Sequence, residues 1–353
     1  MHLAENIDKK KSKWTIGVDL GGTKISVGLI NETGKIEQYL KIPTQAEQGQ
    51  KETINRIKQS IYQIIELNNL KIGGIAGIGI GAPGPVDYQR GIVHCAPNLP
   101  GWTEVPLADI MRKEFPIPIK VENDANAAAW GEKIFGVARG IDELVCLTLG
   151  TGIGGGLILC GEIYHGKNFV AGEIGHMVVN KIGPRCNCGK NGCLEAYSSA
   201  AGIRDRISKR IASLKSQPDN QKFLNIYNLE NIGLAQIFEL ARQGNMIVKD
   251  IVEEAIEYLG IAIISLVNIL NPEMVILLGG IANEGEKLLN PIKEIVFQGA
   301  MSSHLPDLKI VLGKLGVFAG VIGAAALLWE HQKYYTLNKK GGPHGQSCFK
   351  ECD

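Results

Sequence analysis

The sequence has almost no excess of charge of either sign, since 37 Lys and Arg residues are balanced by 36 Asp and Glu residues. This balance excludes a global electrostatic attraction to nucleic acid or to an anionic membrane, so we expect neither partner and a ligand that is recognised locally.

No apolar run is long enough to cross a bilayer. The longest, 259–270, carries Ser265 and Asn268 and predicts a buried helix. Residues 1–13 are polar and basic, which predicts neither a signal peptide nor a membrane anchor.

Eight cysteines occur without a secretory signal, which argues against a disulfide framework and predicts a cytoplasmic protein. Three have apolar neighbours, which favours packing: Cys95, Cys146 and Cys160. Cys348 and Cys352 lie in a polar segment, 335–353, near His344. A second metal site and a flexible tail are both open for that segment. The other three cysteines form a local cluster that a metal ion would explain.

Glycine is abundant, because its 44 residues are about 12% of the chain against roughly 7% on average, and they cluster beside strand-like runs. Residues 14–30 and 144–159 each predict a strand, a glycine turn and a second strand, and this similarity suggests a duplicated lobe. Elsewhere strands alternate with helical patterns, which is typical of an α/β fold. The length of 353 residues suffices for two lobes.

The first glycine turn reads Asp-Leu-Gly-Gly-Thr-Lys from Asp19 to Lys24. Gly21 and Gly22 let backbone N–H groups approach a phosphate, and Thr23 and Lys24 can donate to its oxygens. Asp19, at the end of a strand, can hold Mg²⁺ through water. The spacing matches neither a Walker loop nor a dinucleotide fingerprint, so an ordinary tight hairpin is the alternative.

The second glycine turn, 150–156, includes Thr151 and Gly152. Two glycine-lined hairpins can clamp a polyphosphate from opposite sides, which strengthens the phosphate-binding interpretation of both turns. By itself, the second turn is also compatible with a flexible loop.

Glu122-Asn123-Asp124 follows a predicted strand and begins a helix rich in alanine. Ligands of open α/β sheets collect at such junctions, and a helix N-terminus favours an ionised carboxylate. Asp124 can therefore accept the proton of a sugar hydroxyl during phosphoryl transfer. The alternative is an N-cap, a position that Asp and Asn occupy in many helices.

His176, Cys186, Cys188 and Cys193 supply one imidazole and three thiols within eighteen residues. These are the ligands of a closed tetrahedral zinc site, which predicts a structural zinc ion because no position stays open for water. Glu173 precedes this cluster and Glu195 follows it, so a loop held by the metal would position both carboxylates for the hydroxyls of a sugar. The second ring nitrogen of His176 can donate to the same sugar. Three unrelated buried cysteines are the alternative.

Taken together, these segments resemble the ROK family, named for its repressors, open reading frames and kinases, and within it the bacterial glucokinases. The matching segments are 19–24, 81–87, 96–102, 122–126, 149–156, 173–176 and the cysteine cluster. Their order covers the chain from about residue 14 to 330.

The resemblance implies an α/β fold of the actin-like, ribonuclease H-like type, with two lobes and an active-site cleft between them. We expect an N-terminal lobe over 14–122, completed by a helix near 319–333, and a second lobe over 123–318 with an inserted zinc-binding loop at 176–193. It also implies ATP and Mg²⁺ as cofactors, a sugar as substrate, and a homodimer or homotetramer.

Site residues follow from the same resemblance. The implied catalytic base is Asp124. The implied sugar-binding residues are Gly84, Asn98, Asn123, Asp124, Glu173, His176 and Glu195. The implied nucleotide-binding residues are Asp19, Gly21, Gly22, Thr23, Lys24, Thr151, Gly152, Gly279 and Gly280. The implied zinc ligands are His176, Cys186, Cys188 and Cys193.

Two segments depart from the family pattern. The turn on the adenosine side usually has three glycines, but Leu278 stands where the first is expected, before Gly279 and Gly280. The loop 316–320 has apolar residues where acidic or amide side chains are common. Both departures concern nucleotide binding and leave the sugar chemistry intact.

The expected reaction is transfer of phosphate from ATP to a hexose, with glucose ahead of N-acetylmannosamine, N-acetylglucosamine and other hexoses. A sugar-responsive repressor is an alternative from another class, but the eighteen residues before Asp19 are too few for a DNA-reading element. A regulator that senses sugar without binding DNA is the third interpretation, against which Asp124 and both glycine turns argue.

Overall fold

The structure is a computed structural model that describes residues 14–215 and 233–329. The predicted tail at 335–353, with Cys348 and Cys352, lies outside the described residues. The described chain divides into two units, one ending at Phe135 and resuming at Gly320, the other running from Gly136 to Ala319. None of the helices in the described part combines the length and apolarity that a bilayer crossing requires.

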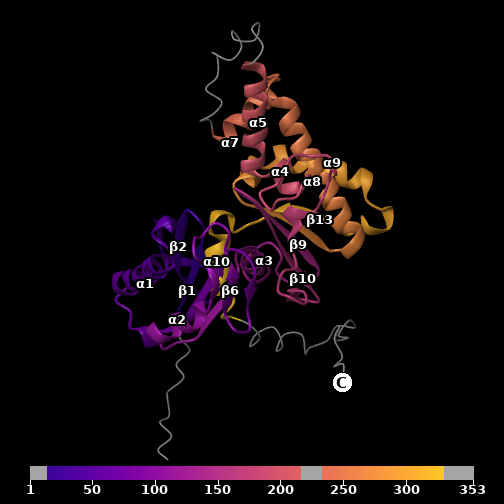
Figure 1. The fold of residues 1–353 in the computed structure, drawn as a ribbon. Helices are drawn as coiled ribbons and strands as arrows, with labels where there is room; N and C mark the ends of the chain where they lie inside the picture. The colour runs from indigo at the N-terminus through magenta and orange to yellow at the C-terminus, as the bar shows by residue number, and fades with distance from the viewer. Residues whose placement is uncertain (1–13, 216–232, 330–353) are drawn as a thin grey trace, which may run out of the picture. The chain divides into compact units, whose positions relative to one another are not determined.

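The first unit is built on a five-stranded sheet of order β3-β2-β1-β4-β8 (Figure 1). Its strands are β1 (Trp14–Leu20), β2 (Lys24–Asn31), β3 (Ile36–Pro43), β4 (Ile75–Ala82) and β8 (Ile119–Asn123). β1 and β2 form the predicted antiparallel hairpin, and β4 and β8 continue the sheet in parallel with β1. The carboxyl ends of β1, β4 and β8 therefore meet at one edge.

Successive side chains of β1 point to opposite faces of the sheet. Ile16 and Val18 pack into a core with α1 (Gln50–Leu67) and α2 (Leu107–Glu114). Gly17 lies on the opposite face, which α3 (Asp124–Ile134) and α10 (Ala319–Ala326) cover side by side (Figure 1). The Trp130 indole N–H donates to the Ala326 carbonyl at 3.3 Å and joins those two helices.

A small antiparallel sheet follows β4 in the chain. It consists of β5 (Val86–Asp87), β6 (Ile92–Cys95) and β7 (Thr103–Val105), in that order. The loop 96–102, which contains Asn98, connects β6 to β7 and is therefore held at both ends.

The second unit repeats the strand order of the first, β11-β10-β9-β12-β13. Its strands are β9 (Leu144–Leu149), β10 (Ile153–Leu159), β11 (Glu162–Ile163), β12 (Met274–Leu278) and β13 (Lys309–Leu312). β9 and β10 form the second predicted hairpin, and β12 pairs in parallel with both β9 and β13. The predicted duplicated lobe is confirmed.

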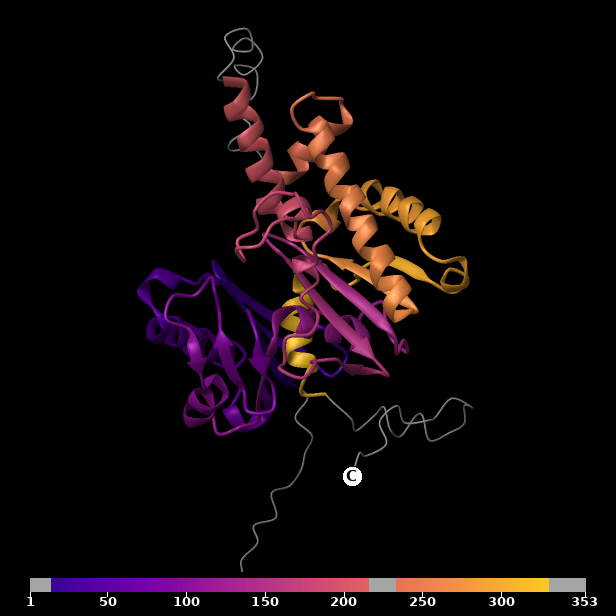
Figure 2. The same cartoon turned by 45° about the vertical axis from the view of Figure 1, so that its right-hand side comes forward.

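Helices of the second unit cover its sheet around one large core (Figure 2). They are α4 (Leu194–Ser198), α5 (Ala200–Lys215), α7 (Leu234–Arg242), α8 (Lys249–Leu270) and α9 (Glu286–Gly299). The predicted buried helix at 259–270 is the second half of α8. Its Leu259 and Ile263 are buried, whereas Ile269 on the opposite side is 75% exposed.

The division between the units falls after α3, whereas the sequence-based boundary lay at 122–123. β8 runs directly into α3, and α3 packs back on β4 and β8. Its small side chains allow this close approach, since Ala127 lies against both Gly81 and Gly323. The boundary moves because the strand and the helix form one packed segment.

Close packing of α10 on the first sheet gives a stability prediction. A methyl group on Gly79 would overlap the carbonyl oxygen of Ala324, so we expect Gly79→Ala to lower the free energy of unfolding by about 3 kcal/mol. The matched control is Gly73→Ala, whose methyl would enter open space, with an expected change under about 0.5 kcal/mol. Urea-induced unfolding measures both, and equal stability of the two variants would contradict the packing.

Candidate active site

The first glycine turn is held by its own backbone and by one threonine. Gly21 N donates to Lys24 O at 3.0 Å, which closes the turn between β1 and β2. Thr44 donates its N–H to Thr23 O at 2.9 Å and its hydroxyl to Gly21 O at 2.7 Å. The turn is thus fixed before any ligand binds. No motif marks Thr44, because only the pairing of β2 with β3 brings it to this turn.

Asn98 packs directly on that turn. A Cβ added to Gly22 would lie 2.8 Å from the Asn98 Cβ, so glycine is required for this contact. In the loop, Ala96 N donates to Trp102 O at 3.2 Å, and Trp102 is buried while Asn98 is exposed. The packed tryptophan and the exposed asparagine are therefore compatible features of one loop.

The junction of β8 and α3 separates the roles of Asn123 and Asp124. Asn123 is the N-cap of α3, since its Oδ1 accepts from Ala125 N at 3.0 Å and from Asn126 N at 3.1 Å. Its Nδ2 donates to Gly84 O at 3.1 Å. Asp124 is the first residue of the helix, and its Oδ1 accepts from Ala125 N at 2.8 Å. The capping function thus belongs to Asn123, and the helix N-terminus favours the ionised Asp124 carboxylate.

Two further residues fix this junction. The buried Glu122 accepts through Oε1 from Asn123 N at 2.8 Å and from Asn126 Nδ2 at 3.1 Å. Gly84 has a φ of 82°, and a Cβ there would overlap the Cys95 carbonyl oxygen. Only glycine fits at position 84, whose carbonyl oxygen accepts the hydrogen bond from Asn123 Nδ2. The sequence assigned Glu122 no separate role, because its burial depends on the helix packed over it.

Asp19 lies at the carboxyl end of β1, beside the N-terminal residues of α10. A Cβ added to Gly320 would lie 2.8 Å from the Asp19 Cγ. Burial raises the pKa of Asp19 to about 6, and the positive charge of Lys41 opposes this rise. Part of the Asp19 surface is nevertheless accessible. A cation at this carboxylate would offset the cost of its burial.

In the second unit, the glycine turn between β9 and β10 is tied to the start of two helices. Ala200 N donates to Gly150 O at 3.0 Å. The Glu195 carboxylate accepts through Oε2 from Ile153 N at 2.9 Å. A Cβ on Gly152 would overlap that same oxygen, so the turn can meet Glu195 only because residue 152 is glycine. The predicted phosphate turn and a predicted sugar-binding carboxylate are thereby in direct contact.

The structure brings the four predicted zinc ligands together. The ligand atoms of His176, Cys186, Cys188 and Cys193 all lie within 4.8 Å of one another. Cys188 Sγ is 3.6 Å from Cys193 Sγ, and Cys186 Sγ is 3.7 Å from His176 Nδ1. Tetrahedral thiolates about 2.3 Å from a zinc ion are about 3.7 Å apart, so these separations fit such a site.

Residues 178–193 form a tight knuckle around the cluster, closed by an antiparallel bridge between Val178 and Cys193. Cys186 N donates to Lys190 O at 2.8 Å, and the φ values of Gly189 and Gly192 are 87° and 75°. Burial raises the pKa of the Cys193 thiol to about 12, whereas a backbone hydrogen bond from Lys190 lowers that of Cys188. Three adjacent thiols therefore need a cation in order to ionise together.

The two predicted sugar-binding groups before the knuckle lie beside each other. His176 Nε2 is 3.9 Å from Glu173 Oε2, while its Nδ1 is the nitrogen nearest Cys186. The ring thus has one nitrogen nearest the cluster and the other on the side of the Glu173 carboxylate.

Gly279 and Gly280 follow β12, at the same edge of the sheet as the turn after β9. Gly279 has a φ of 95°, and a Cβ there would lie 2.5 Å from the Leu149 carbonyl oxygen. Leu278 is buried as the last residue of β12, and Gly280 has open space around it. The departure from three glycines therefore falls within the strand and leaves the close approach at Gly279 unchanged.

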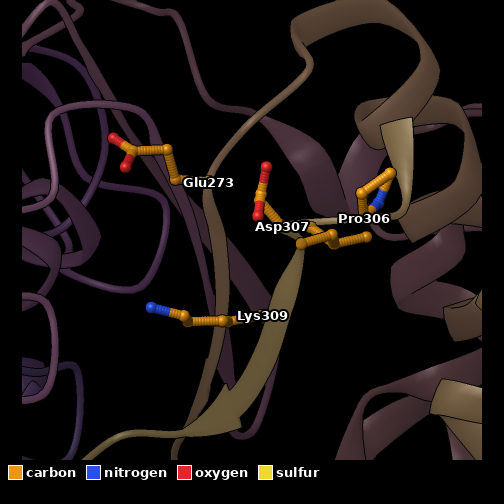
Figure 3. A pocket seen from close by; sticks show the side chains of 5 residues that line it. Glu273, Pro306, Asp307 and Lys309 are labelled. Atoms are coloured by element: carbon orange, nitrogen blue, oxygen red, sulfur yellow. The ribbon is translucent and has the colours of Figure 1, made fainter. Parts of the chain in front are cut away.

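A cavity of about 380 Å³ lies elsewhere in the second unit, lined by Glu273, Pro306, Asp307, Leu308 and Lys309 (Figure 3). These residues precede β12 or lie at the start of β13, at the opposite end of the strands from the Gly279 turn. The cavity contains none of the predicted site residues.

The raised pKa of Asp19 gives a pH-dependent prediction. The pKa rises from 3.8 to about 6 on folding, so ionisation of Asp19 destabilises the folded protein from about pH 4 upward and fully above pH 6. Without nucleotide or metal, we expect Asp19→Asn to raise the free energy of unfolding by about 3 kcal/mol at pH 8 and to lose this gain near pH 4. The exposed Asp109→Asn is the control. Thermal unfolding at both pH values measures the effect, and an Asp19→Asn protein no more stable than wild type at pH 8 contradicts it.

Comparison with known proteins gives one consistent family. The profile of the ROK family matches residues 15–331. A glucokinase of Thermotoga maritima is 39% identical over 89% of this chain and 97% of that protein. A xylose repressor of Caldicellulosiruptor bescii is 34% identical over 89% of this chain and 77% of the repressor. A ROK family glucokinase from Streptomyces griseus, solved with glucose and AMPPNP, is 35% identical over 89% of this chain and 98% of that one, with a TM-score of 0.75. The chain therefore belongs to the ROK family and has its actin-like α/β fold.

Proposed function

We propose that this protein is an ATP-dependent glucose kinase that forms glucose 6-phosphate. The observation that carries the proposal is the position of Asp124, at the first residue of α3, with the capping function supplied by Asn123. Glucokinases that are 35–39% identical over about nine-tenths of the chain support the reaction and the substrate. The Streptomyces griseus relative carries glucose and an ATP analogue.

In the first unit, Asp124 acts as the general base that accepts the proton of the attacking sugar hydroxyl. Asn98, Asn123 and Gly84 bind the sugar around it. Gly21, Gly22, Thr23 and Lys24 bind the phosphates, and Asp19 holds Mg²⁺ through water. The contact between Gly22 and Asn98 supports this division, because it joins the phosphate turn to the sugar loop within one unit.

In the second unit, Glu173, His176 and Glu195 accept or donate hydrogen bonds to the sugar hydroxyls. Thr151 and Gly152 bind the phosphates, and Gly279 and Gly280 lie against the adenosine. His176, Cys186, Cys188 and Cys193 hold a zinc ion with a structural role, for which the ligand separations near 3.7 Å are the support. The zinc ion supplies no step of the transfer. It fixes the loop that carries the sugar-binding groups.

Two properties belong to the same proposal. The six described cysteines are free thiols, which supports a reducing, cytoplasmic setting and a role in sugar metabolism. The protein acts as a homodimer or homotetramer. Glucose is the proposed substrate, and the alternative is a kinase of the same family for N-acetylmannosamine, N-acetylglucosamine or another hexose.

An ADP-release assay with ATP and Mg²⁺ across a panel of hexoses and N-acetylhexosamines tests the reaction and the specificity together. We expect turnover with the highest kcat/KM for glucose. The likeness to xylose repressors makes a sugar sensor the second candidate. Sugar binding without release of ADP would favour the sensor and overturn the kinase.

We expect Asp124→Asn to lower kcat by at least about 10³-fold while glucose affinity changes little, because the amide keeps its hydrogen bonds but cannot accept the proton. The matched control is Asp109→Asn on the exposed side of α2, which should keep full activity. Steady-state kinetics and glucose titration measure both quantities. Undiminished turnover in Asp124→Asn removes this residue as the base.

Metal analysis of the purified protein should find about one zinc ion per chain. Cys188→Ser should lose that zinc and bind glucose more weakly, because a closed site depends on all four ligands. Cys160→Ser is the control, since Cys160 lies outside the knuckle and should leave the zinc content unchanged. A fully active protein without metal would contradict the structural zinc ion.

A further inference from the structure

Asn180 connects the base of the knuckle to the rest of the second unit. Its backbone N–H donates to Gly192 O at 3.3 Å, and its carbonyl accepts from Gly183 N at 3.0 Å. Its Oδ1 accepts from Ile182 N at 3.2 Å. A Cβ on Gly192 would overlap the Asn180 carbonyl oxygen, so the first and last segments of the knuckle are in direct contact here. Gly192 directly precedes Cys193, and Glu195 follows two residues later.

The remaining polar group of Asn180 reaches a tyrosine on another helix. Its Nδ2 donates to the hydroxyl oxygen of Tyr258, on α8, at 2.9 Å. The ring of Tyr258 lies 4.1 Å from the ring of Tyr197, which is buried on α4. A Cβ on Gly183 would overlap the Tyr197 hydroxyl. Two tyrosine hydroxyls therefore meet the 180–183 turn from one side.

A partly buried arginine on α5, Arg206, contacts this tyrosine pair through Tyr197. The Arg206 guanidinium lies 4.9 Å from the centre of the Tyr197 ring and donates to the Tyr197 carbonyl at 3.5 Å. It also forms an ion pair with Glu254 on α8. The cation is satisfied by groups of α4 and α8, which meet α5 in this region (Figures 1 and 2). The tyrosines are thus anchored in the helical layer and not in the knuckle itself.

We propose that Tyr258 is a positioning residue for sugar binding, acting through Asn180 on the knuckle that ends in Glu195. The only side chain of α8 hydrogen-bonded to the knuckle in the described part of the chain is its phenol. Loss of this bond lets the 180–183 turn move and displaces the paired Gly192, and with it the start of α4. This inference rests on the proposed kinase activity and on Glu195 as a sugar ligand.

The test is the kinetics of Tyr258→Phe, which removes the hydroxyl and keeps the ring that packs on Tyr197. We expect the KM for glucose to rise about fivefold, the value of one lost hydrogen bond, with kcat within about twofold of wild type. The KM for ATP should also stay within about twofold, because Ala200 N and Ala201 N still hold the second glycine turn. A general loss of stability would instead lower the melting temperature and the active fraction without raising the KM.

Two further variants separate positioning from general damage. Asn180→Asp should keep the KM for glucose near the wild-type value, because a carboxylate can accept hydrogen bonds both from Ile182 N and from the Tyr258 hydroxyl. Asn180→Ala, and Asn180→Asp combined with Tyr258→Phe, should both raise the KM for glucose about fivefold or more. The matched control is Tyr62→Phe, whose hydroxyl donates to Glu114 on the surface of the first unit and which should match wild type.

The outcomes are distinguishable. If wild-type protein releases no ADP with any sugar, the proposed function fails and the inference with it. If wild type is active and Tyr258→Phe has an unchanged KM for glucose, or if Asn180→Asp behaves like Asn180→Ala, the kinase stands and the positioning role of Tyr258 is overturned.

Discussion

The hydrogen bond from Ile153 N to Glu195 Oε2, at 2.9 Å, joins a predicted phosphate turn of the second unit to a predicted sugar-binding carboxylate. Glu195 is the second residue of α4 and follows Cys193, a member of the cluster of His176 and three cysteines, by two residues. Its Oε1 also accepts from Cys186 Sγ at 3.8 Å, and its Oε2 can approach the glycine turn between β9 and β10 because Gly152 has no side chain. The predicted metal ligands, a predicted sugar-binding carboxylate and a predicted phosphate turn are therefore connected through Glu195.

In the first unit, too, glycines allow close contacts between predicted binding segments. Gly22 lets Asn98 pack on the phosphate turn, and Gly84 offers its carbonyl to the Asn123 amide from a backbone conformation that favours glycine. In both units, a glycine without a side chain allows a predicted sugar-binding group to touch a predicted phosphate turn. Asp19 adds the cost of a buried carboxyl group, which a cation at the site would remove.

The local features of the sequence predicted the two hairpins and the gathering of the four candidate metal ligands. Both hairpins and the knuckle are built from residues close in the chain, so glycine spacing and ligand spacing were sufficient. The roles of Asn123 and Asp124 stayed open because either side chain can cap a helix, and only the hydrogen bonds of Asn123 separate them. Thr44 and Tyr258 carry no sequence signal, since each contacts its neighbours through the pairing of strands or the packing of helices from distant segments. The two compact units divide after α3, which packs on β4 and β8 and against α10, and these contacts join segments far apart in the sequence.

We propose that a zinc ion, through Glu195 and its neighbours, holds the sugar-binding groups in place without taking part in the transfer. Calorimetric titration of glucose into zinc-loaded, zinc-stripped and reloaded protein tests this role most directly. We expect zinc stripping to weaken glucose binding at least about tenfold, and one equivalent of Zn²⁺ to restore the original affinity. Equal affinity of the loaded and stripped protein for glucose would contradict it.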